Sequence, residues 1–220
     1  MLFRSDKQVR AFIARQPAGL IVNLGCGLDT RFHRLDNGSI VWIEMDLPEV
    51  IAFRKRLDEP PTARHRLLAG SVLDERWVEE IAPWAGQPTL LVAEGLLSYF
   101  TEEQHKFIFG YLARGFRGQE MLFQTSAPSV ARGLAPSSDL SKLKTAAAVQ
   151  WQWGLEEGSQ VSALDPRVRF VDEFPLLAGL EHVLAPELRQ QLSTEQIRKA
   201  AKIVHVRFDP AGQGNAVPLG

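Results

Sequence analysis

The sequence predicts a doubly wound α/β domain whose sheet is mostly parallel and ends in an antiparallel strand pair. Short apolar runs alternate with helical patterns over residues 5–125. Parallel strands need crossover connections, and these connections cover both faces of a sheet. Two later apolar runs have strand composition and are separated by a helical pattern, which favours an antiparallel pair. We therefore expect a single domain over residues 1–208, followed by a flexible tail at residues 209–220.

Apolar runs and their periodicity give the order of the elements. Pro48 stands where the first turn of a helix would begin, and Thr101 with Gln104 matches a capping box. The expected strands lie at residues 19–24, 40–45, 67–69, 89–93, 120–125, 168–171 and 203–208, and the expected helices at residues 5–15, 49–57, 75–81, 101–116, 141–153 and 186–202.

Residues 127–160 interrupt the alternation of strands and helices. The segment begins with a run rich in Pro, Ser and Gly, and it contains Trp151 and Trp153. It follows the fifth strand on the side of the sheet where open α/β folds bind their ligands. We therefore expect an insertion that covers the substrate, with both tryptophans as flat apolar walls. Packing of the two rings in the core is the alternative.

The composition excludes several classes of function. The 220 residues include 25 Lys and Arg and 26 Asp and Glu, so no broad cationic field attracts nucleic acid or an anionic membrane. Cys26 is the single cysteine, and no Cys and His residues have zinc-site spacing, so we expect neither a disulfide nor a metal. The charged start of the chain and its short apolar runs predict a cytoplasmic protein that binds a small molecule.

A Gly-Cys-Gly turn at residues 25–27 is the first pattern that carries chemistry. Glycines let the backbone turn sharply and approach a ligand, and the helix expected next offers free N–H groups to an anion. Asp46 follows Gly27 by 19 residues, at the end of the next expected strand. An acid at that place binds the ribose hydroxyls in nucleotide-binding α/β folds. Together the two patterns predict a nucleoside cofactor.

The charges near this turn indicate which nucleoside binds. A dinucleotide site usually has a third glycine where this chain has Thr30, and Asp29 would face any pyrophosphate. NAD and FAD are therefore disfavoured. S-adenosylmethionine carries no phosphate, and its sulfonium and ammonium charges suit the carboxylates of Asp29 and Glu94. Capping of the following helix is an equally good role for Asp29.

Three segments of the chain read NLGCGLDTRF at residues 23–32, EMDLPEVI at residues 44–51 and AEGLLSYF at residues 93–100. In this order they resemble the signatures of the leucine carboxyl methyltransferase family, which includes polyketide-synthesis O-methyltransferases of the tetracenomycin type. The resemblance covers residues 1–125. It implies the class I S-adenosylmethionine-dependent methyltransferase fold, that cofactor, and methyl transfer to an oxygen of a small molecule, such as a carboxylate of a polyketide-like metabolite.

The resemblance also implies roles for the residues that match the family's motifs. Gly25, with the neighbouring Cys26 and Gly27, would lie against the methionine part of the cofactor. Asp46 would bind the ribose hydroxyls, and Glu94 would face the methionine ammonium.

Two further cofactor contacts are implied where the match is looser. The family has an Asp-Leu pair beside the adenine, and this chain has Ser71 and Val72 there, so the usual acid is absent. The family also has an arginine, upstream of the glycine turn, that pairs with the cofactor carboxylate. Arg4 is the nearest candidate for this arginine, and Arg10 is its rival.

The sequence contains no evident base for the acceptor. His33 is the histidine nearest a motif, and Tyr99 follows the fourth expected strand, so these two are the candidates for catalysis. A carboxylate acceptor needs no base, whereas a hydroxyl acceptor does, so the pattern favours a carboxylate or an acidic phenol. Cys26 is expected to be a small packed side chain rather than a redox group.

Two other functions are consistent with the residues. A module that binds S-adenosylmethionine without catalysis would keep the cofactor pocket and lack the acceptor site. An NAD-dependent oxidoreductase would need a dinucleotide site despite the missing third glycine. The sequence does not indicate an oligomeric state.

Overall fold

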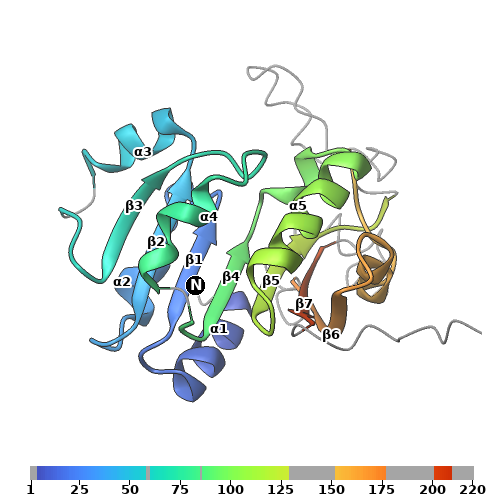
Figure 1. Ribbon diagram of the computed structural model, residues 1–220, viewed down its shortest axis with the longest axis horizontal. Coiled ribbons are helices and arrows are strands. Elements are labelled where there is room, and N and C mark those ends of the chain that lie inside the picture. Colours follow the sequence, from blue (N-terminus) through green and yellow to red (C-terminus); the bar gives the residue numbers. More distant parts are fainter. Residues whose placement is uncertain (1–3, 58–59, 85, 129–151, 177–200, 210–220) are drawn as a thin grey trace, which may run out of the picture.

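The computed structural model describes residues 4–57, 60–84, 86–128, 152–176 and 201–209. Within these ranges, seven strands form one sheet in the order β3-β2-β1-β4-β5-β7-β6 (Figure 1). The first five strands pair in parallel, and β7 runs antiparallel to both β5 and β6. The predicted fold class, a doubly wound and mostly parallel sheet with a terminal antiparallel pair, is confirmed.

The described elements alternate as the sequence predicts. The strands are β1 (Leu20–Leu24), β2 (Val41–Asp46), β3 (His65–Ala69), β4 (Thr89–Ala93), β5 (Glu120–Thr125), β6 (Val168–Pro175) and β7 (Lys202–Phe208). The α-helices are α1 (Arg4–Arg15), α2 (Arg31–Leu35), α3 (Pro48–Arg54), α4 (Trp77–Glu80) and α5 (Glu102–Gly115), and the 3-10 helices are η1 (Ala82–Trp84), η2 (Leu97–Tyr99) and η4 (Gly158–Ala163).

Two hydrophobic cores lie on opposite faces of the sheet, because successive side chains of a strand point to opposite sides. On β1, Leu20 and Val22 pack in the core that contains α4 and α5, whereas Ile21 packs in the core that contains α1 and α2. Figure 1 shows α4 and α5 crossing one face of the sheet. Burial on both faces explains why these parallel strands are continuous apolar runs.

The local signals at two helix starts are also confirmed. The Gln104 N–H donates to the Thr101 hydroxyl at 3.3 Å, and the Thr101 N–H donates to the Gln104 side-chain oxygen at 2.9 Å. This reciprocal pair satisfies two N–H groups that the first turn of α5 leaves without helical partners. Pro48 is the first residue of α3, where its missing N–H costs nothing.

Some element boundaries differ from those predicted. β6 continues to Pro175 instead of ending at Val171, because it pairs with β7 beyond a bulge between Phe170 and Asp172. Its polar residues hide this extension in the sequence. Trp151, most of the helix predicted at 141–153, nearly all of the helix predicted at 186–202 and residues 210–220 lie outside the described residues.

The strand order places the carboxyl ends of β1, β2 and β4 side by side. The chain proceeds from β1 outward to β2 and β3, and then returns past β1 to β4 and β5. In open α/β sheets, ligands bind at the carboxyl ends of the strands where the order reverses. The glycine turn after β1, Asp46 at the end of β2 and Glu94 after β4 all lie at this edge.

In the described part of the chain, no helix has the length and apolar content to cross a membrane.

Glu120, at the start of β5, is a partly buried carboxylate bound by three basic side chains. Its Oε2 lies 2.9 Å from both Arg15 Nη2 and His205 Nε2, and its Oε1 lies 3.0 Å from Arg207 Nη2. The hydrogen bond from His205, helped by Arg207 and Arg15, outweighs burial and lowers the pKa of Glu120 to about 2. The carboxylate thereby ties the end of α1 to the antiparallel part of the sheet.

We expect the Glu120→Gln variant to lose stability in a pH-dependent way. A carboxyl group whose pKa is lowered by folding contributes stability above its unfolded pKa near 4.5, and this contribution disappears as the pH falls toward 2. At pH 7 the loss should be on the order of 1–2 kcal/mol, because Arg15 and Arg207 are half-exposed and water screens their charges.

Urea denaturation of both proteins between pH 7 and pH 3 measures this difference in the free energy of unfolding. The difference should shrink toward pH 3. The Glu103→Gln control, at an exposed position on α5, should stay close to wild type throughout. A Glu120→Gln difference that is independent of pH would show that the charge of Glu120 does not contribute.

Candidate functional site

The glycine turn continues from β1 and bends over the end of β2. Gly25 and Gly27 have φ angles of 64° and 48°, in the left-handed region that favours glycine. The Cys26 N–H donates to the carbonyl of Met45 at 3.0 Å, which fixes the start of the turn against β2. A Cβ on Gly25 would come within 2.8 Å of Leu96. Position 25 therefore requires glycine for packing as well as for its backbone angle.

Asp46 lies beside this turn, and each oxygen of its carboxylate accepts one backbone hydrogen bond. The Gly27 N–H donates to Asp46 Oδ2 at 2.7 Å, and the Leu47 N–H donates to Oδ1 at 2.7 Å. Each carboxylate oxygen has room to accept a further hydrogen bond. A Cβ added to Gly27 would meet nothing within 4 Å, so open space adjoins the turn. The arrangement can accept hydrogen bonds from ligand hydroxyls that enter this space.

Glu94 belongs to a network of charged side chains centred on Arg31. The Arg31 guanidinium pairs with Asp6 at 2.9 Å, with Asp29 at 2.9 Å and with Glu94. The Ser5 hydroxyl donates to Glu94 Oε2 at 2.8 Å. Burial would lower the pKa of Arg31, but the surrounding carboxylates raise it. The network fixes the amino end of α1, which carries Ser5 and Asp6, against the carboxyl edge of the sheet.

Asp29 serves the structure of the turn. Its Oδ1 accepts the Arg31 N–H at 2.9 Å, and its Oδ2 accepts the Asn23 side-chain amide at 3.0 Å. The residue at the N-cap of α2 is Thr30, whose side chain makes no capping hydrogen bond. Asp29 thus satisfies the first N–H of the helix from one residue earlier, which agrees with the capping alternative. A contact between Asp29 and the cofactor stays a prediction.

Cys26 is a buried thiol inside the turn. Burial, and then the nearby Glu44 carboxylate, raise the pKa of the Cys26 thiol. The thiol is therefore neutral at pH 7 and a poor nucleophile. This agrees with the prediction of a small packed side chain. In the described part of the chain, no three His, Cys, Asp or Glu side chains are grouped so as to hold a metal.

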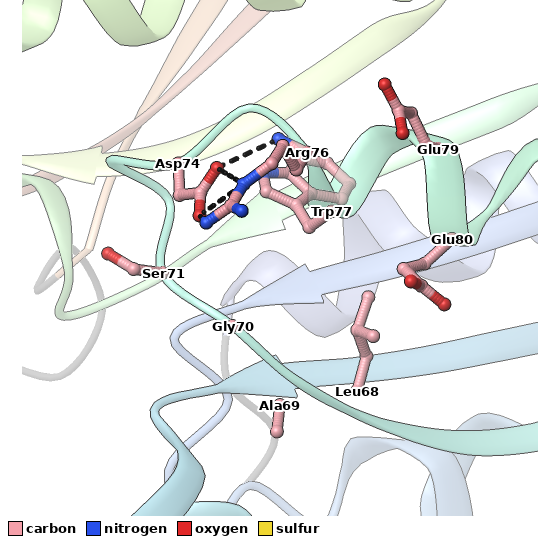
Figure 2. Close-up of a pocket in the computed structure, with 9 residues that line it drawn as sticks. All are labelled: Leu68, Ala69, Gly70, Ser71, Asp74, Arg76, Trp77, Glu79 and Glu80. Carbon is pink, nitrogen blue, oxygen red and sulfur yellow. Dashed lines mark hydrogen bonds and ion pairs between the residues drawn. The ribbon is translucent and has the colours of Figure 1, made fainter.

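A cavity of about 300 Å³ lies beside the expected adenine contacts (Figure 2). It extends from the loop after β3, which contains Ser71, to α4. Figure 2 shows the Asp74–Arg76 ion pair at one end of the cavity and Glu79 and Glu80 on α4. Most of its lining residues belong to the edge strand β3 and to α4, and none belongs to the glycine turn at residues 25–27. The cavity therefore adjoins the carboxyl edge of the sheet but does not include the turn.

Ser71 and Val72 are both tied to neighbouring backbone. The Ser71 hydroxyl accepts the N–H of Leu73 at 3.2 Å, and the buried Val72 offers its carbonyl to the Tyr111 hydroxyl at 2.9 Å. The adenine contact of both residues stays a prediction.

The two candidate catalytic residues occupy different parts of the sheet. The His33 ring contacts the ring of His65, with 5.7 Å between centroids, and His65 is the first residue of β3. His33 therefore lies toward the amino end of a parallel strand, away from the edge that carries Asp46. Tyr99 lies in η2, after Glu94, and its side chain is 38% exposed. Its place near the carboxyl edge is the better one for a contact with the acceptor.

Trp153 lies in a short segment that crosses the ends of β4 and β5. The Gln152 N–H donates to the Ser98 carbonyl at 2.7 Å, and the Leu155 N–H donates to the Ser126 carbonyl at 2.9 Å. The Trp153 ring is buried and stacks on His105 of α5 with 3.7 Å between centroids. These contacts are those of a core residue. A role of Trp153 in the acceptor pocket stays a prediction, and Trp151 lies outside the described residues.

His105, the partner of Trp153, is neutral at neutral pH. Burial lowers its pKa to about 4, although its ring Nδ1 lies 2.7 Å from the Thr101 carbonyl oxygen. The ring thus acts as part of the apolar packing that supports η2. Of the two candidate arginines, Arg10 is exposed and donates to the Arg34 carbonyl at 3.5 Å, whereas the structure describes only the backbone of Arg4, at the start of α1.

Several residues of this edge were not singled out from the sequence. They are Ser5, Asp6, Asn23, Arg31, Glu44 and Arg54. One signal was present, since Glu44 is an acid inside an apolar run, and acids are almost never buried without a partner. Arg31 stands inside the first signature, but nothing local shows that a residue 25 positions earlier will neutralise it.

We expect the Arg31→Met variant to lose about 3–5 kcal/mol of the free energy of unfolding at pH 7, because its three carboxylate partners would stay charged without it. Thermal or urea denaturation measures the loss. The matched control is Arg10→Met on the exposed face of α1, which should change stability by about 0.5 kcal/mol or less. Equal stability of the two variants would contradict a buried charge network.

Comparison with known proteins agrees with this geometry. The family model described as leucine carboxyl methyltransferase matches residues 3–113, half of the chain. The tetracenomycin polyketide synthesis O-methyltransferase TcmP of Streptomyces glaucescens is 28% identical over 173 residues, which are 78% of this chain and 62% of that protein. The S-adenosyl-L-methionine-dependent methyltransferase dpfgK of Gibberella zeae is 25% identical over 167 residues, 72% of this chain and 56% of that protein.

The chain thus spans less than two thirds of the length of these curated relatives. Among solved structures, a putative methyltransferase from Thermobifida fusca superposes with a TM-score of 0.61 at 12% identity, covering 93% of this chain and 80% of that one. At this identity the likeness shows the fold alone. The family match spans the glycine turn, Asp46 and Glu94, which lie in the three segments that carried the resemblance. The chain belongs to the leucine carboxyl methyltransferase family.

Proposed function

We propose that this chain carries the catalytic domain of an S-adenosylmethionine-dependent O-methyltransferase that acts on a small molecule. The observation that carries the proposal is the Asp46 carboxylate, which lies at the carboxyl end of β2 and binds the Gly27 N–H beside open space. An acid there, next to a glycine turn, suits the two hydroxyls of a ribose. The relative TcmP, whose name describes polyketide O-methylation, supports an oxygen of a small molecule as the acceptor.

The charges at this edge suit a cationic cofactor better than a pyrophosphate. Arg31 is paired with Asp6, and Arg54 is paired with Glu44, so neither guanidinium is available to a phosphate. The carboxylate of Asp29, two residues after Gly27, would repel a pyrophosphate placed over the turn. S-adenosylmethionine has an ammonium, a sulfonium and one carboxylate, and it gains from negative surroundings. These charges favour S-adenosylmethionine over NAD as the ligand of the turn.

Each part of the cofactor has candidate partners along the edge. Asp46 would accept hydrogen bonds from the ribose hydroxyls, and the backbone of residues 25–27 would lie along the methionine part. The contacts that the structure shows for Glu94 both use Oε2, so Oε1 is the oxygen that would meet the ammonium. Ser71 and Val72 would border the adenine.

The bound cofactor would supply a methyl group activated by its sulfonium. Transfer to an oxygen in line with that bond depends on alignment and on exclusion of water more than on covalent catalysis. Residues 152–155, which bridge the ends of β4 and β5, would shield one side of the reacting atoms. His33 lies away from this edge and His105 is buried, so neither supplies a base here, which favours an acceptor that is already ionised. We therefore propose a carboxylate or an acidic phenol.

Calorimetric titration tests the cofactor assignment. We expect S-adenosylmethionine and its demethylated product, S-adenosylhomocysteine, to bind with a dissociation constant near the micromolar range. This corresponds to a binding free energy of about -8 kcal/mol. The Asp46→Asn variant should bind at least about tenfold more weakly, because a charged acceptor of the ribose hydroxyls is lost while the shape is kept. The matched control is Asp36→Asn. Asp36 stands at the end of α2 and its carboxylate pairs with Arg64, so this variant should leave the affinity for the cofactor unchanged.

A wild-type protein that binds NAD and neither methionine-derived ligand would refute the proposal. Methyl transfer is then tested with S-adenosylmethionine that carries a labelled methyl group and a panel of aromatic carboxylic acids and phenols. Mass spectrometry should find a labelled methyl ester or ether. Tight cofactor binding without transfer to any member of the panel would favour the non-catalytic binding module instead.

A further inference from the structure

Arg54, in the last turn of α3, is a buried guanidinium beneath the glycine turn. Arg54 is 1% exposed, and its Nη1 donates to the carbonyl oxygen of Gly27 at 3.1 Å. Its Nη2 lies 3.5 Å from Oε1 of Glu44, which is fully buried within β2. Arg54 therefore connects α3 and β2 with the backbone of the glycine turn.

The charge of Arg54 is matched by a chain of polar groups under the turn. Oε2 of Glu44 accepts the side-chain amide of Asn23 at 2.8 Å, and the same amide lies 3.0 Å from Oδ2 of Asp29. A buried ion pair adds little net stability compared with apolar residues of the same volume. Net stability is thus a weak explanation for an arginine at this position. Its hydrogen bond to the carbonyl of Gly27 is the stronger explanation.

Gly27 is the residue that needs this support. Its φ of 48° is in the left-handed region, and a Cβ added to it would meet nothing within 4 Å. Neighbouring side chains therefore do not hold it by packing. Instead, Asp46 binds its N–H at 2.7 Å and Arg54 binds its carbonyl oxygen at 3.1 Å. The two charged side chains thus bind the two backbone polar groups of one residue.

We propose that Arg54 is a positioning residue for the cofactor, because it holds the Gly27 carbonyl and so keeps the Gly27 N–H on Asp46. This role rests on the proposed function. The Gly27–Asp46 hydrogen bond sets the direction of the carboxylate that the ribose hydroxyls would meet. Without Arg54, the turn would sample other backbone angles, and the carboxylate would lose its fixed orientation. Arg54 acts through the turn and need not touch the cofactor.

Removing Arg54 alone would leave Glu44 buried without its cation, so the Arg54→Met variant should be destabilised for that reason. The double variant Glu44→Gln/Arg54→Met separates the two effects, because it removes both charges of the pair. We expect its thermal midpoint to return close to that of Glu44→Gln. We expect its affinity for S-adenosylhomocysteine, measured by calorimetry, to stay about tenfold below that of Glu44→Gln.

The Arg56→Met variant is the matched control, two residues after the end of α3. Arg56 is exposed, and its guanidinium stacks over the ring of Phe53 at 4.9 Å. Its affinity for S-adenosylhomocysteine should equal that of wild type. A second readout is hydrogen exchange of the peptide that covers residues 25–29, which should be faster in the double variant than in Glu44→Gln, without any ligand present.

The outcomes separate the role of Arg54 from the function itself. A double variant that binds S-adenosylhomocysteine as tightly as Glu44→Gln, with unchanged exchange at residues 25–29, would overturn the positioning role and leave the proposed function standing. A wild-type protein that binds no S-adenosylhomocysteine would overturn the proposed function and this role with it. Weaker binding together with faster exchange, at restored stability, supports the proposal.

Discussion

Buried charge at the carboxyl ends of β1, β2 and β4 is the constraint on which the candidate site depends. Arg31 and Arg54 are only 2% and 1% exposed, and a guanidinium can be removed from water only if carboxylates and other acceptors surround it. Arg31 therefore holds α1 through Asp6 and reaches Glu94 after β4. Arg54 joins α3 to Glu44 of β2 and to the glycine turn. These pairs connect three helices, α1, α2 and α3, with the carboxyl ends of β1, β2 and β4.

The same pairs prepare the edge for a ligand of particular charge. Their basic members are already neutralised, so a ligand meets mainly carboxylates, of which Asp46 and Glu94 are partly accessible. Gly27 binds Asp46 and Arg54, and these hydrogen bonds define its left-handed backbone conformation. Preorganised acceptors cost little rearrangement when a ligand binds. This links the buried network to the nucleoside chemistry proposed for the turn.

The sequence predicts the fold well because its signals are local. Apolar runs buried on both faces, Pro48 at N1 of α3 and the Thr101 capping box each depend on residues close in the chain. It also predicts the turn and Asp46, whose spacing follows from one β-α-β unit. It could not predict that Arg31 meets Asp6 and Glu94, since that requires α1 and β4 to lie together. The core environment of Trp153 depends in the same way on His105 of a distant helix.

A crystal structure of the protein with S-adenosylhomocysteine tests the central claim most directly. We expect both ribose hydroxyls to lie within hydrogen-bond distance of the Asp46 carboxylate and the amino group of the ligand to lie at Glu94. We also expect the hydrogen bonds from Gly27 to Asp46 and from Arg54 to Gly27 to persist. A nucleoside bound elsewhere, such as in the cavity beside α4, with the Asp46 carboxylate left without ligand contact, would contradict it.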